Sequence, residues 1–504
     1  MVNRLGHFID GERVQKVNSR YADVFNPASG EIIARVLLAS NHEVRQAVEA
    51  ATAALPAWMA TPPQKRAQVM FRFRELVLKN MDQLALLVSR EHGKTLEDAA
   101  GSITRGLEVV EFVCGIPHLL KGDYSALVAD GVDSFNLRQP VGVCVGITPF
   151  NFPAMVPMWM FPVALACGNT FILKPSERNP SCGLRLAELM VEAGLPRGCL
   201  NVINGDKETV DALLSEPGVS AVSFVGSTKV GKSVYTKATA SGKRVQALCG
   251  AKNHMVIMPD ADIGQAVDAA VGAAFGSAGE RCMAVSVAVA VGEETAEEFR
   301  SMLIPRIQSL KIAPFTDEKA ELGPVINSAA KDRIERYIGE GIKAGAELVV
   351  DGRGVKLQGY ENGCFVGGTL LDHVKSEMSV YKDEIFGPVL CIIRASNYTE
   401  AKKLVINHEY GNGATIFTRD GDTARDFVQE VNIGMVGVNV PIPVPVAYHS
   451  FGGWKASLFG DHAIHGMEGV RFYTKLKTVT ARWPSGIKEG AVFNFHGGSE
   501  TNNV

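Results

Sequence analysis

The chain has 504 residues, of which 46% are hydrophobic and 21% are charged, and its formal net charge is −3 at pH 7. This length is enough for two or three domains that each bury a core, and the small negative charge excludes a general attraction to nucleic acid or to acidic membranes. The nine cysteines are scattered without a C-x-x-C pair, which indicates neither a metal site nor a disulfide framework and favours a reducing, cytoplasmic location.

The N-terminal half alternates between helical and strand patterns. Residues 1–14 predict a short strand and a turn with no leader sequence. Apolar residues at helical spacing follow in 43–59 and 63–91. Apolar, β-branched segments then alternate with helix-like stretches, at 141–149, 170–174, 200–205 and 221–227. Strands separated by helices of this length are typical of a parallel α/β sheet.

A second α/β series begins at His254. Its apolar strand segments are 254–263, 283–292, 346–352 and 388–396. Residues 472–483 alternate like an antiparallel strand, which we expect to pair between subunits, and the last dozen residues have the composition of a frayed end. The sequence therefore predicts two α/β units and an extended tail.

The longest uncharged stretch, residues 150–173, raises the question of a membrane span. Asn151 and the prolines Pro153, Pro157 and Pro162 argue against a spanning helix. We expect a buried segment of a soluble protein.

The segment GSTKVGKS, Gly226–Ser233, matches the phosphate-loop pattern G-x-x-x-x-G-K-[ST] and follows a predicted strand. It raises the alternative of an ATPase or GTPase, which also needs a magnesium-binding carboxylate such as Asp260. A glycine-rich turn into a helix N-terminus binds the pyrophosphate of a dinucleotide equally well. The motif alone leaves both classes open.

The segment GERCMA, residues 279–284, places Cys282 behind Arg281 and ahead of an apolar run, so Cys282 is either a nucleophile or a buried thiol. Four further segments decide between these alternatives: PFNFP (149–153), KPSE (174–177), FVGSTKVG (224–231) and EIFGP (384–388). In this order and at these spacings, the five segments resemble the aldehyde dehydrogenase superfamily over nearly the whole chain.

The resemblance implies an α/β chain with the aldehyde dehydrogenase fold in three parts. A Rossmann-like, parallel-sheet NAD-binding domain would span 1–122 and 141–252, and an α/β catalytic domain would span 253–446. A small β oligomerisation arm and the C-terminal tail would span 123–140 and 447–504 and make a homodimer or homotetramer. On this interpretation the phosphate-loop match is coincidental and Lys232 faces outward.

Further segments narrow the resemblance. GAKNH (250–254), VNVPIPVP (438–445) and FYTKLKTVT (472–480) are similar to those of the CoA-acylating methylmalonate-semialdehyde dehydrogenases. That family would convert methylmalonate or malonate semialdehyde to propionyl-CoA or acetyl-CoA by oxidative decarboxylation, with NAD as cofactor and coenzyme A as co-substrate. The preferred semialdehyde stays open, as does the pathway, of which valine catabolism is one alternative.

The resemblance assigns the catalytic roles. Cys282 matches the nucleophile that forms a thioester, and Asn151 with the Cys282 N–H matches the oxyanion donors. Arg281 supplies positive charge that favours the thiolate. The alternative for Asn151 is that it only holds a loop between two prolines.

The resemblance also implies a dinucleotide site. Lys174 and Glu177 match the residues at the adenine ribose, and the carboxylate favours NAD over NADP, although Arg178 beside it suits a phosphate. Glu384 matches the carboxylate at the nicotinamide ribose, and Phe386 would support the nicotinamide ring. The other positions expected along the dinucleotide are Thr148, Phe150, Gly226, Ser227, Gly231 and Cys249.

Two positions depart from the hydrolytic members of the superfamily. Leu248 stands where they carry the glutamate that activates water, and leucine cannot accept a proton. A CoA thiol can release the acyl group without that base. Glu280 stands where the family usually has glutamine. A carboxylate there could raise the pKa of the Cys282 thiol or pair with Arg281. It could also take over as base, which would favour the alternative of a hydrolytic NAD(P)-dependent aldehyde dehydrogenase.

A semialdehyde acid needs a cation for its distal carboxylate, and the planar fork of arginine fits a carboxylate best. Arg281 and Arg105 are the substrate-binding candidates, although Arg105 on a predicted helix is alternatively a solvated side chain. A folded, inactive NAD-binding protein is a further alternative, which the intact Cys282 and Asn151 disfavour.

Overall fold

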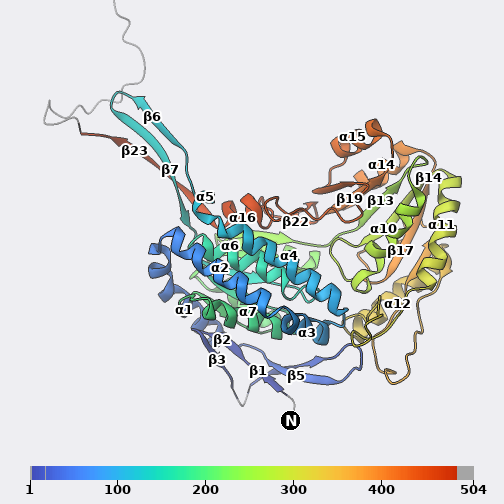
Figure 1. The fold of residues 1–504 in the computed structure, drawn as a ribbon, viewed down its shortest axis with the longest axis horizontal. Helices are drawn as coiled ribbons and strands as arrows, with labels where there is room; N and C mark the ends of the chain where they lie inside the picture. Colours follow the sequence, from blue (N-terminus) through green and yellow to red (C-terminus); the bar gives the residue numbers. More distant parts are fainter. Residues whose placement is uncertain (1–2, 17–18, 485–504) are drawn as a thin grey trace, which may run out of the picture.

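A computed structural model describes residues 3–16 and 19–484, which form two α/β units and a projecting β arm (Figure 1). The expected frayed C-terminal end lies outside these residues. Within the described residues no helix is both long enough and apolar enough to cross a membrane.

The first unit is built on an eight-stranded sheet in the order β22-β12-β11-β8-β9-β10-β2-β3. Its five central strands are parallel, as expected from the alternation of strands and helices. They are β8 (Val143–Ile147), β9 (Thr170–Lys174), β10 (Leu200–Val202), β11 (Val219–Val225) and β12 (Arg244–Leu248). The antiparallel edges are β2 (His7–Ile9) and β3 (Glu12–Val14) on one side and β22 (Leu458–Phe459) on the other.

Helices cover both faces of this sheet. Those that contact its strands are α1 (Asn41–Ala60), α6 (Met155–Ala166), α7 (Ser181–Glu192), α8 (Lys207–Ser215) and α9 (Thr228–Ala240). Outside α6 and α7 pack α2 (Pro63–Lys79), α3 (Met81–His92), α4 (Leu96–Cys114) and α5 (Ile116–Leu119). The helical pattern in 63–91 forms two helices rather than one. The chain breaks at Asn80, whose side-chain amide donates to the carbonyl of Leu76 and ends α2.

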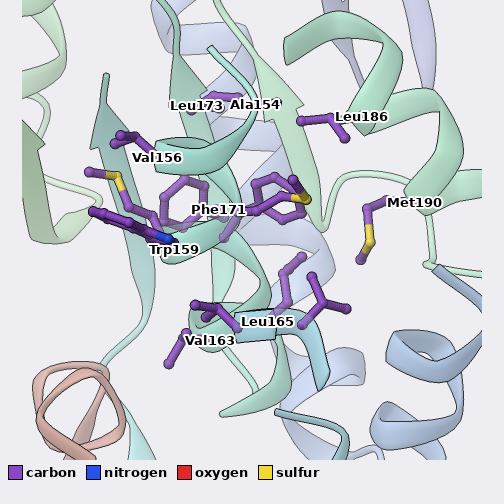
Figure 2. Packing of buried hydrophobic residues seen from close by; sticks show 14 of the residues in the cluster. Ala154, Val156, Trp159, Val163, Leu165, Phe171, Leu173, Leu186 and Met190 are labelled. Carbon is purple, nitrogen blue, oxygen red and sulfur yellow. The ribbon is translucent and has the colours of Figure 1, made fainter. Parts of the chain in front are cut away.

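The uncharged stretch 150–173 is the centre of this unit. Every residue of α6 is buried, and so is every residue of β9. Figure 2 shows Trp159 and Leu165 of α6 gathered around Phe171 of β9, with Leu186 of α7 beyond them. The apolar run is therefore long because a buried helix precedes a buried strand, which confirms the expectation of a buried segment.

The second unit contains a seven-stranded sheet in the order β15-β16-β17-β14-β13-β19-β20, parallel except for the edge strand β15. Its strands are β13 (Asn253–Ile257), β14 (Val285–Val291), β15 (Glu347–Val350), β16 (Thr369–Asp372), β17 (Val389–Ala395), β19 (Gly413–Phe417) and β20 (Met435–Val438). Its helices are α10 (Ile263–Phe275), α11 (Glu293–Gln308), α12 (Ser328–Lys343), α13 (Ser379–Lys382), α14 (Tyr398–Asn407) and α15 (Gly421–Glu430).

The arm is a three-stranded antiparallel sheet that projects from the first unit (Figure 1). It consists of β6 (Tyr124–Ala129), β7 (Val132–Pro140) and β23 (Thr474–Arg482). The tail strand β23 pairs with β7 of its own chain over nine residues. Pairing between subunits stays a prediction for the free edge of β23.

The segment before β23 does not belong to the arm. β22 pairs with β12 of the first sheet, and α16 (Gly466–Phe472) packs against α6. β22 thereby covers the edge of β12, while the assignment of 447–504 to the arm and the C-terminal tail stays a prediction. Two small sheets complete the chain: β1 (Asn3–Leu5), β4 (Tyr21–Phe25) and β5 (Ile32–Leu37), and β18 (Tyr410–Gly411) with β21 (Trp454–Lys455).

Candidate active site

Cys282 lies between two cavities at the junction of the two units. It follows α10 and a short 3-10 turn, Gly276–Gly279, and precedes β14. The half-buried side chain contributes to the wall of a cavity of about 310 Å³ on one side and of a pocket of about 170 Å³ on the other. Side-chain amides of Asn253 and Asn412 donate to its carbonyl oxygen at 2.9 and 3.0 Å. The thiol is therefore fixed where two different ligands can approach it.

The loop before Cys282 has an unusual backbone. Ser277 and Ala278 have φ near +52°, and Gly279 has φ +71°, so three consecutive residues are left-handed. This conformation costs free energy for residues with a Cβ atom. A Cβ atom at Gly279 would lie only 2.2 Å from the carbonyl oxygen of Gly387. The nucleophile thus sits on a strained loop that surrounding contacts must hold.

The larger cavity collects most of the residues predicted for the cofactor. It lies against the ends of β8, β11 and β12, the N-terminus of α9, and the segment that precedes β17. Predicted residues on its wall are Phe150, Asn151, Gly226, Ser227, Cys249, Cys282, Glu384 and Phe386. Pro149, Val225 and Arg333 complete it.

Five residues predicted along the dinucleotide lie outside this wall. Gly231 packs within α9, where a Cβ atom would lie 2.3 Å from the sulfur of Cys249, so it permits close packing of helix on strand. Thr148 follows β8, and its buried hydroxyl has no hydrogen-bond partner among the described residues. Lys174, at the end of β9, pairs with Glu177 at 3.2 Å, while the guanidinium of the exposed Arg178 lies over the Phe150 ring.

The phosphate-loop match does not form a phosphate loop. Only Gly226 and Ser227 separate β11 from α9, and the Gly231 N–H already donates to the Ser227 carbonyl within the helix. Lys232 is exposed on α9. A nucleotide triphosphate would need the backbone of 228–231 to wrap around it, and that backbone is helical.

Asn151 is buried at the start of the segment that leads into α6. Its side-chain amide donates to the Glu280 carbonyl at 3.0 Å, and its own carbonyl accepts from the Lys94 ammonium at 2.8 Å. Lys94 is buried and lies over the Phe152 ring, and burial lowers its pKa to about 8. Asn151 is thereby tied to the loop that carries the nucleophile.

Glu280 is directed away from both cavities. Its carboxyl oxygens accept from the backbone N–H of Ile326 at 3.2 and 3.3 Å and lie 3.7 Å from His92. Burial raises the pKa of Glu280 to about 8. It has no contact with the thiol in this arrangement, which removes the support for Glu280 as a base.

The environment of the thiol opposes the effect of Arg281 on its pKa. Burial, and next the carboxylate of Glu384, raise the pKa of Cys282 to about 12, and the opposing effect of Arg281 is small. Arg281 donates to Asp98 at 2.7 Å, so its charge is largely neutralised. Arg281 therefore acts on the thiol in the expected direction, by lowering its pKa, but burial and Glu384 outweigh this effect.

Glu384 has the geometry of a polar anchor on the cavity wall. One carboxyl oxygen accepts from the Ala251 N–H at 3.0 Å. Lys252 fixes the preceding segment by donating to the carbonyls of Val380 and Asp383. Burial raises the pKa of Glu384 to about 7. Phe386, two residues on, has a left-handed φ of +56° and meets the Phe150 ring edge to face at 5.9 Å.

The smaller pocket contains both predicted substrate arginines. Arg105 pairs with Glu108 at 2.8 Å and donates to the carbonyls of Val444 and Pro445. Apolar side chains make up most of the wall: Phe152, Met155, Trp159, Met283, Ile442, Val444 and Phe451. The pocket therefore suits a small, mostly apolar aldehyde with one anionic end.

Three charged residues of the site were missed from the sequence. Lys94 and Asp98 flank the start of α4, and Arg333 comes from α12 in the other unit. Lys94 and Asp98 could have been found from the sequence. A helix ends at Gly93, and this lysine and aspartate lie on either side of the next N-cap. Nothing local marked Arg333.

A model of the aldehyde dehydrogenase family matches residues 14–479. The chain is 58% identical to a malonate-semialdehyde dehydrogenase of Pseudomonas aeruginosa over 480 residues. These aligned residues are 95% of this chain and 96% of that protein. It is 48% identical to a mitochondrial, acylating methylmalonate-semialdehyde dehydrogenase of Arabidopsis thaliana, over 96% of this chain and 79% of that one.

A crystal structure from Sinorhizobium meliloti 1021, complexed with NAD and assigned as a methylmalonate-semialdehyde dehydrogenase, superposes with a TM-score of 0.96. It is 60% identical in sequence and covers 97% of this chain and 100% of that chain. These similarities confirm the family and the fold class that the sequence predicted, while the domain boundaries and the roles of individual residues stay predictions.

Proposed function

The chain belongs to the aldehyde dehydrogenase family, and on that premise we propose that it oxidises methylmalonate or malonate semialdehyde through a thioester on Cys282. The observation that carries the proposal is the position of Cys282 on the wall of two cavities. One has the polar anchors of a dinucleotide site, and the other has the size and lining of a small aldehyde site.

The residues around the larger cavity fit NAD. The N-terminus of α9 at Ser227 offers backbone N–H groups to a pyrophosphate, and Thr148 has a buried hydroxyl still to be paired. Glu384 and Glu177 are carboxylates suited to ribose hydroxyls. NAD bound there would accept the hydride.

The chain's own residues account for the carbonyl chemistry. The Cys282 thiol first gives up its proton to solvent water, and the thiolate attacks the aldehyde carbon. The oxyanion that forms accepts hydrogen bonds from the Asn151 amide and the Cys282 N–H. The Asn151 amide has two N–H groups, of which one donates to the Glu280 carbonyl and the other is left for the oxyanion. Loss of hydride leaves an acyl group on the Cys282 sulfur.

Decarboxylation and release follow from the substrate. With a carboxylate β to the thioester carbonyl, the carbon–carbon bond breaks, CO2 leaves, and the electron pair enters the thioester as an enolate that takes up a proton. The thiolate of coenzyme A then displaces Cys282, giving propionyl-CoA or acetyl-CoA. Arg105 and Arg281 would hold the carboxylate beforehand.

Transfer to CoA is favoured over hydrolysis by what surrounds the thioester. Leu248 is apolar and buried in β12, and the carboxyl group of Glu280 faces Ile326 and His92. Neither can take a proton from water near Cys282. The hydrolytic alternative therefore lacks its general base at both candidate positions.

The experiment that tests the function is NADH formation from methylmalonate semialdehyde with and without CoA, with products identified by mass. We expect sustained turnover only with CoA, and propionyl-CoA and CO2 as products. Sustained turnover without CoA that yields a free acid would contradict acyl transfer to CoA.

The arm supports a homodimer or homotetramer, which we propose together with the predicted domain boundaries. It exposes large apolar side chains that an isolated protein rarely leaves in water: Tyr124, Leu127, Val128, Leu476 and Trp483. Nine free cysteines fit a reducing compartment, the cytoplasm.

A further inference from the structure

Asp98 connects the strained loop to the aldehyde pocket. It lies in the first turn of α4, three residues after the N-cap Thr95. One carboxyl oxygen accepts from Arg281 at 2.7 Å, and the other accepts from the hydroxyl of Ser277. A single carboxylate thus holds two points of the loop, the first of its left-handed residues and Arg281, which follows them.

The contact with Ser277 bears on the backbone strain. Ser277 and Ala278 are the two left-handed residues of this loop that carry a Cβ atom, and such residues persist only where surrounding contacts over-determine them. Asp98 is directly bonded to the first of them. Loss of this bond would let the loop, and the sulfur five residues on, relax from its position.

The contact with Arg281 bears on the substrate. Asp98, Gly101 and Arg281 line the aldehyde pocket and also a surface hollow of about 390 Å³, so the ion pair is part of the partition between them. An arginine side chain has many rotamers, and a pairing on one edge of its fork fixes where the remaining donors lie. Asp98 therefore decides which donors of Arg281 are left for a ligand in the pocket.

We propose that Asp98 is a positioning residue of this active site, which holds the nucleophile loop through Ser277 and fixes the guanidinium of Arg281 for the carboxylate of the substrate. This inference rests on the proposed function, because it needs a carboxylated aldehyde in the pocket. The two contacts make separable contributions, one to the rate with any aldehyde and the other to the binding of an anionic one.

The charge of Asp98 is stable over the working pH range. Although burial opposes ionisation, the charges of Lys94 and Arg281 and the hydrogen bond from Ser277 hold the pKa of Asp98 near 2. The groups that face it are the ammonium of Lys94, the guanidinium of Arg281 and the hydroxyl of Ser277. The ion pair therefore stays intact wherever the enzyme is assayed.

The test compares Asp98→Asn, Ser277→Ala and the control Glu97→Gln with two aldehydes, methylmalonate semialdehyde and propanal, by NADH formation. Propanal has the same three-carbon aldehyde chain without the carboxylate. Glu97 is an exposed carboxylate in the same first turn of α4, so its replacement removes the same charge from the same helix end.

Asp98→Asn is expected to raise the KM for the semialdehyde about tenfold or more, because the weakened bond involves a charged group. The change in kcat/KM for propanal, which has no carboxylate, is expected to be smaller. Ser277→Ala is expected to lower kcat for both aldehydes by a similar factor, about three- to tenfold. Glu97→Gln is expected to stay within about twofold of the wild type. An equal loss for both aldehydes in Asp98→Asn, or behaviour like Glu97→Gln, overturns the proposal.

A second readout needs no substrate. The rate of alkylation of Cys282 by iodoacetamide, followed by peptide mass spectrometry, is expected to reach half its maximum at a lower pH in Asp98→Asn, because the charge of Arg281 is no longer neutralised beside the thiol. The absence of such a shift contradicts the coupling. If the wild type does not distinguish the two aldehydes, the semialdehyde assignment fails, while this readout still judges Asp98.

Should Asp98→Asn yield no folded protein, Asp98→Glu takes its place, since it keeps the charge and displaces the carboxylate by one methylene. The same selective loss for the semialdehyde, in smaller measure, then supports the proposal. An equal loss for both aldehydes contradicts it.

Discussion

The two cavities that meet at Cys282 are built in different ways. The larger one lies at the carboxyl ends of neighbouring parallel strands, where α/β sheets commonly bind nucleotides, and short sequence motifs supply its wall. The smaller pocket is assembled from α4, α6 and the loop around 442–451, segments that lie far apart in the sequence. Arg105 and Pro445, for example, meet across 340 residues. Cofactor binding therefore depends on local motifs, and substrate choice depends on long-range packing.

Cys282 is common to both cavities, so its loss should have the largest effect. Cys282→Ser replaces the thiol by a hydroxyl that is far harder to ionise, and NADH formation is expected to fall about a thousandfold or more with any aldehyde. Steady-state NADH fluorescence measures it. Cys249→Ser, at the other thiol on the same cavity wall, is the matched control and should keep most of its activity. Full activity of Cys282→Ser would contradict the thioester mechanism.

Asn151 lies on the wall of the larger cavity with Cys282 and is the proposed side-chain donor to the oxyanion. Asn151→Ala is expected to lower kcat about a hundredfold, because one oxyanion donor is lost at the point where charge develops. The rate of iodoacetamide alkylation of Cys282 should change much less, since alkylation forms no oxyanion. Equal losses in both assays would mean that Asn151 only holds the loop between the prolines.

Glu384 makes the nucleotide side sensitive to pH, in contrast to Asp98 on the substrate side. Because burial raises the pKa of Glu384 to about 7, the carboxyl gains a proton as the pH falls through 7 and loses capacity to accept hydrogen bonds from a ribose. The KM for NAD is expected to rise by up to about tenfold from pH 8 to pH 6. Glu384→Gln should flatten this profile, and a KM that rises equally in that variant would assign the effect to another group.

Lys232 should have the smallest effect. It is exposed on α9 and outside the cavity wall, so Lys232→Ala is expected to change kcat and the KM for NAD by no more than about twofold. Steady-state kinetics and magnesium-dependent ATP binding check it together. A collapse of activity accompanied by ATP binding would revive the nucleotide-hydrolase alternative.

The fold was predictable where buried strands form continuous apolar runs. Thr170–Lys174 is a strand with the expected bounds, because five consecutive buried residues lie between a turn and Pro175. The two-residue strand β22 was not predictable, since a strand this short carries no periodicity and exists only because β12 lies beside it.

The same division holds for the site. Glu384 and Phe386 lie on the cavity wall with Cys282, as the motif EIFGP indicated. The pairing of Arg281 with Asp98 could not be predicted, because it joins residues 183 positions apart. Charges in a sequence show neither their partners nor their burial, which together decide the sign of a pKa shift.

The return of the chain to its first sheet has a consequence for how the protein is made. The backbone N–H of Cys249 donates to Ser457, and the Ser457 hydroxyl donates to Gly250, so this part of the nucleotide cleft is secured by residues near the end of the chain. A ribosome delivers those residues last, and until then the margin of β12 is open to pairing with other nascent chains. Translation that stops before residue 457 therefore leaves a fragment that has every cofactor motif but an unpaired edge at β12. We expect such a fragment to be bound by chaperones and to be inactive.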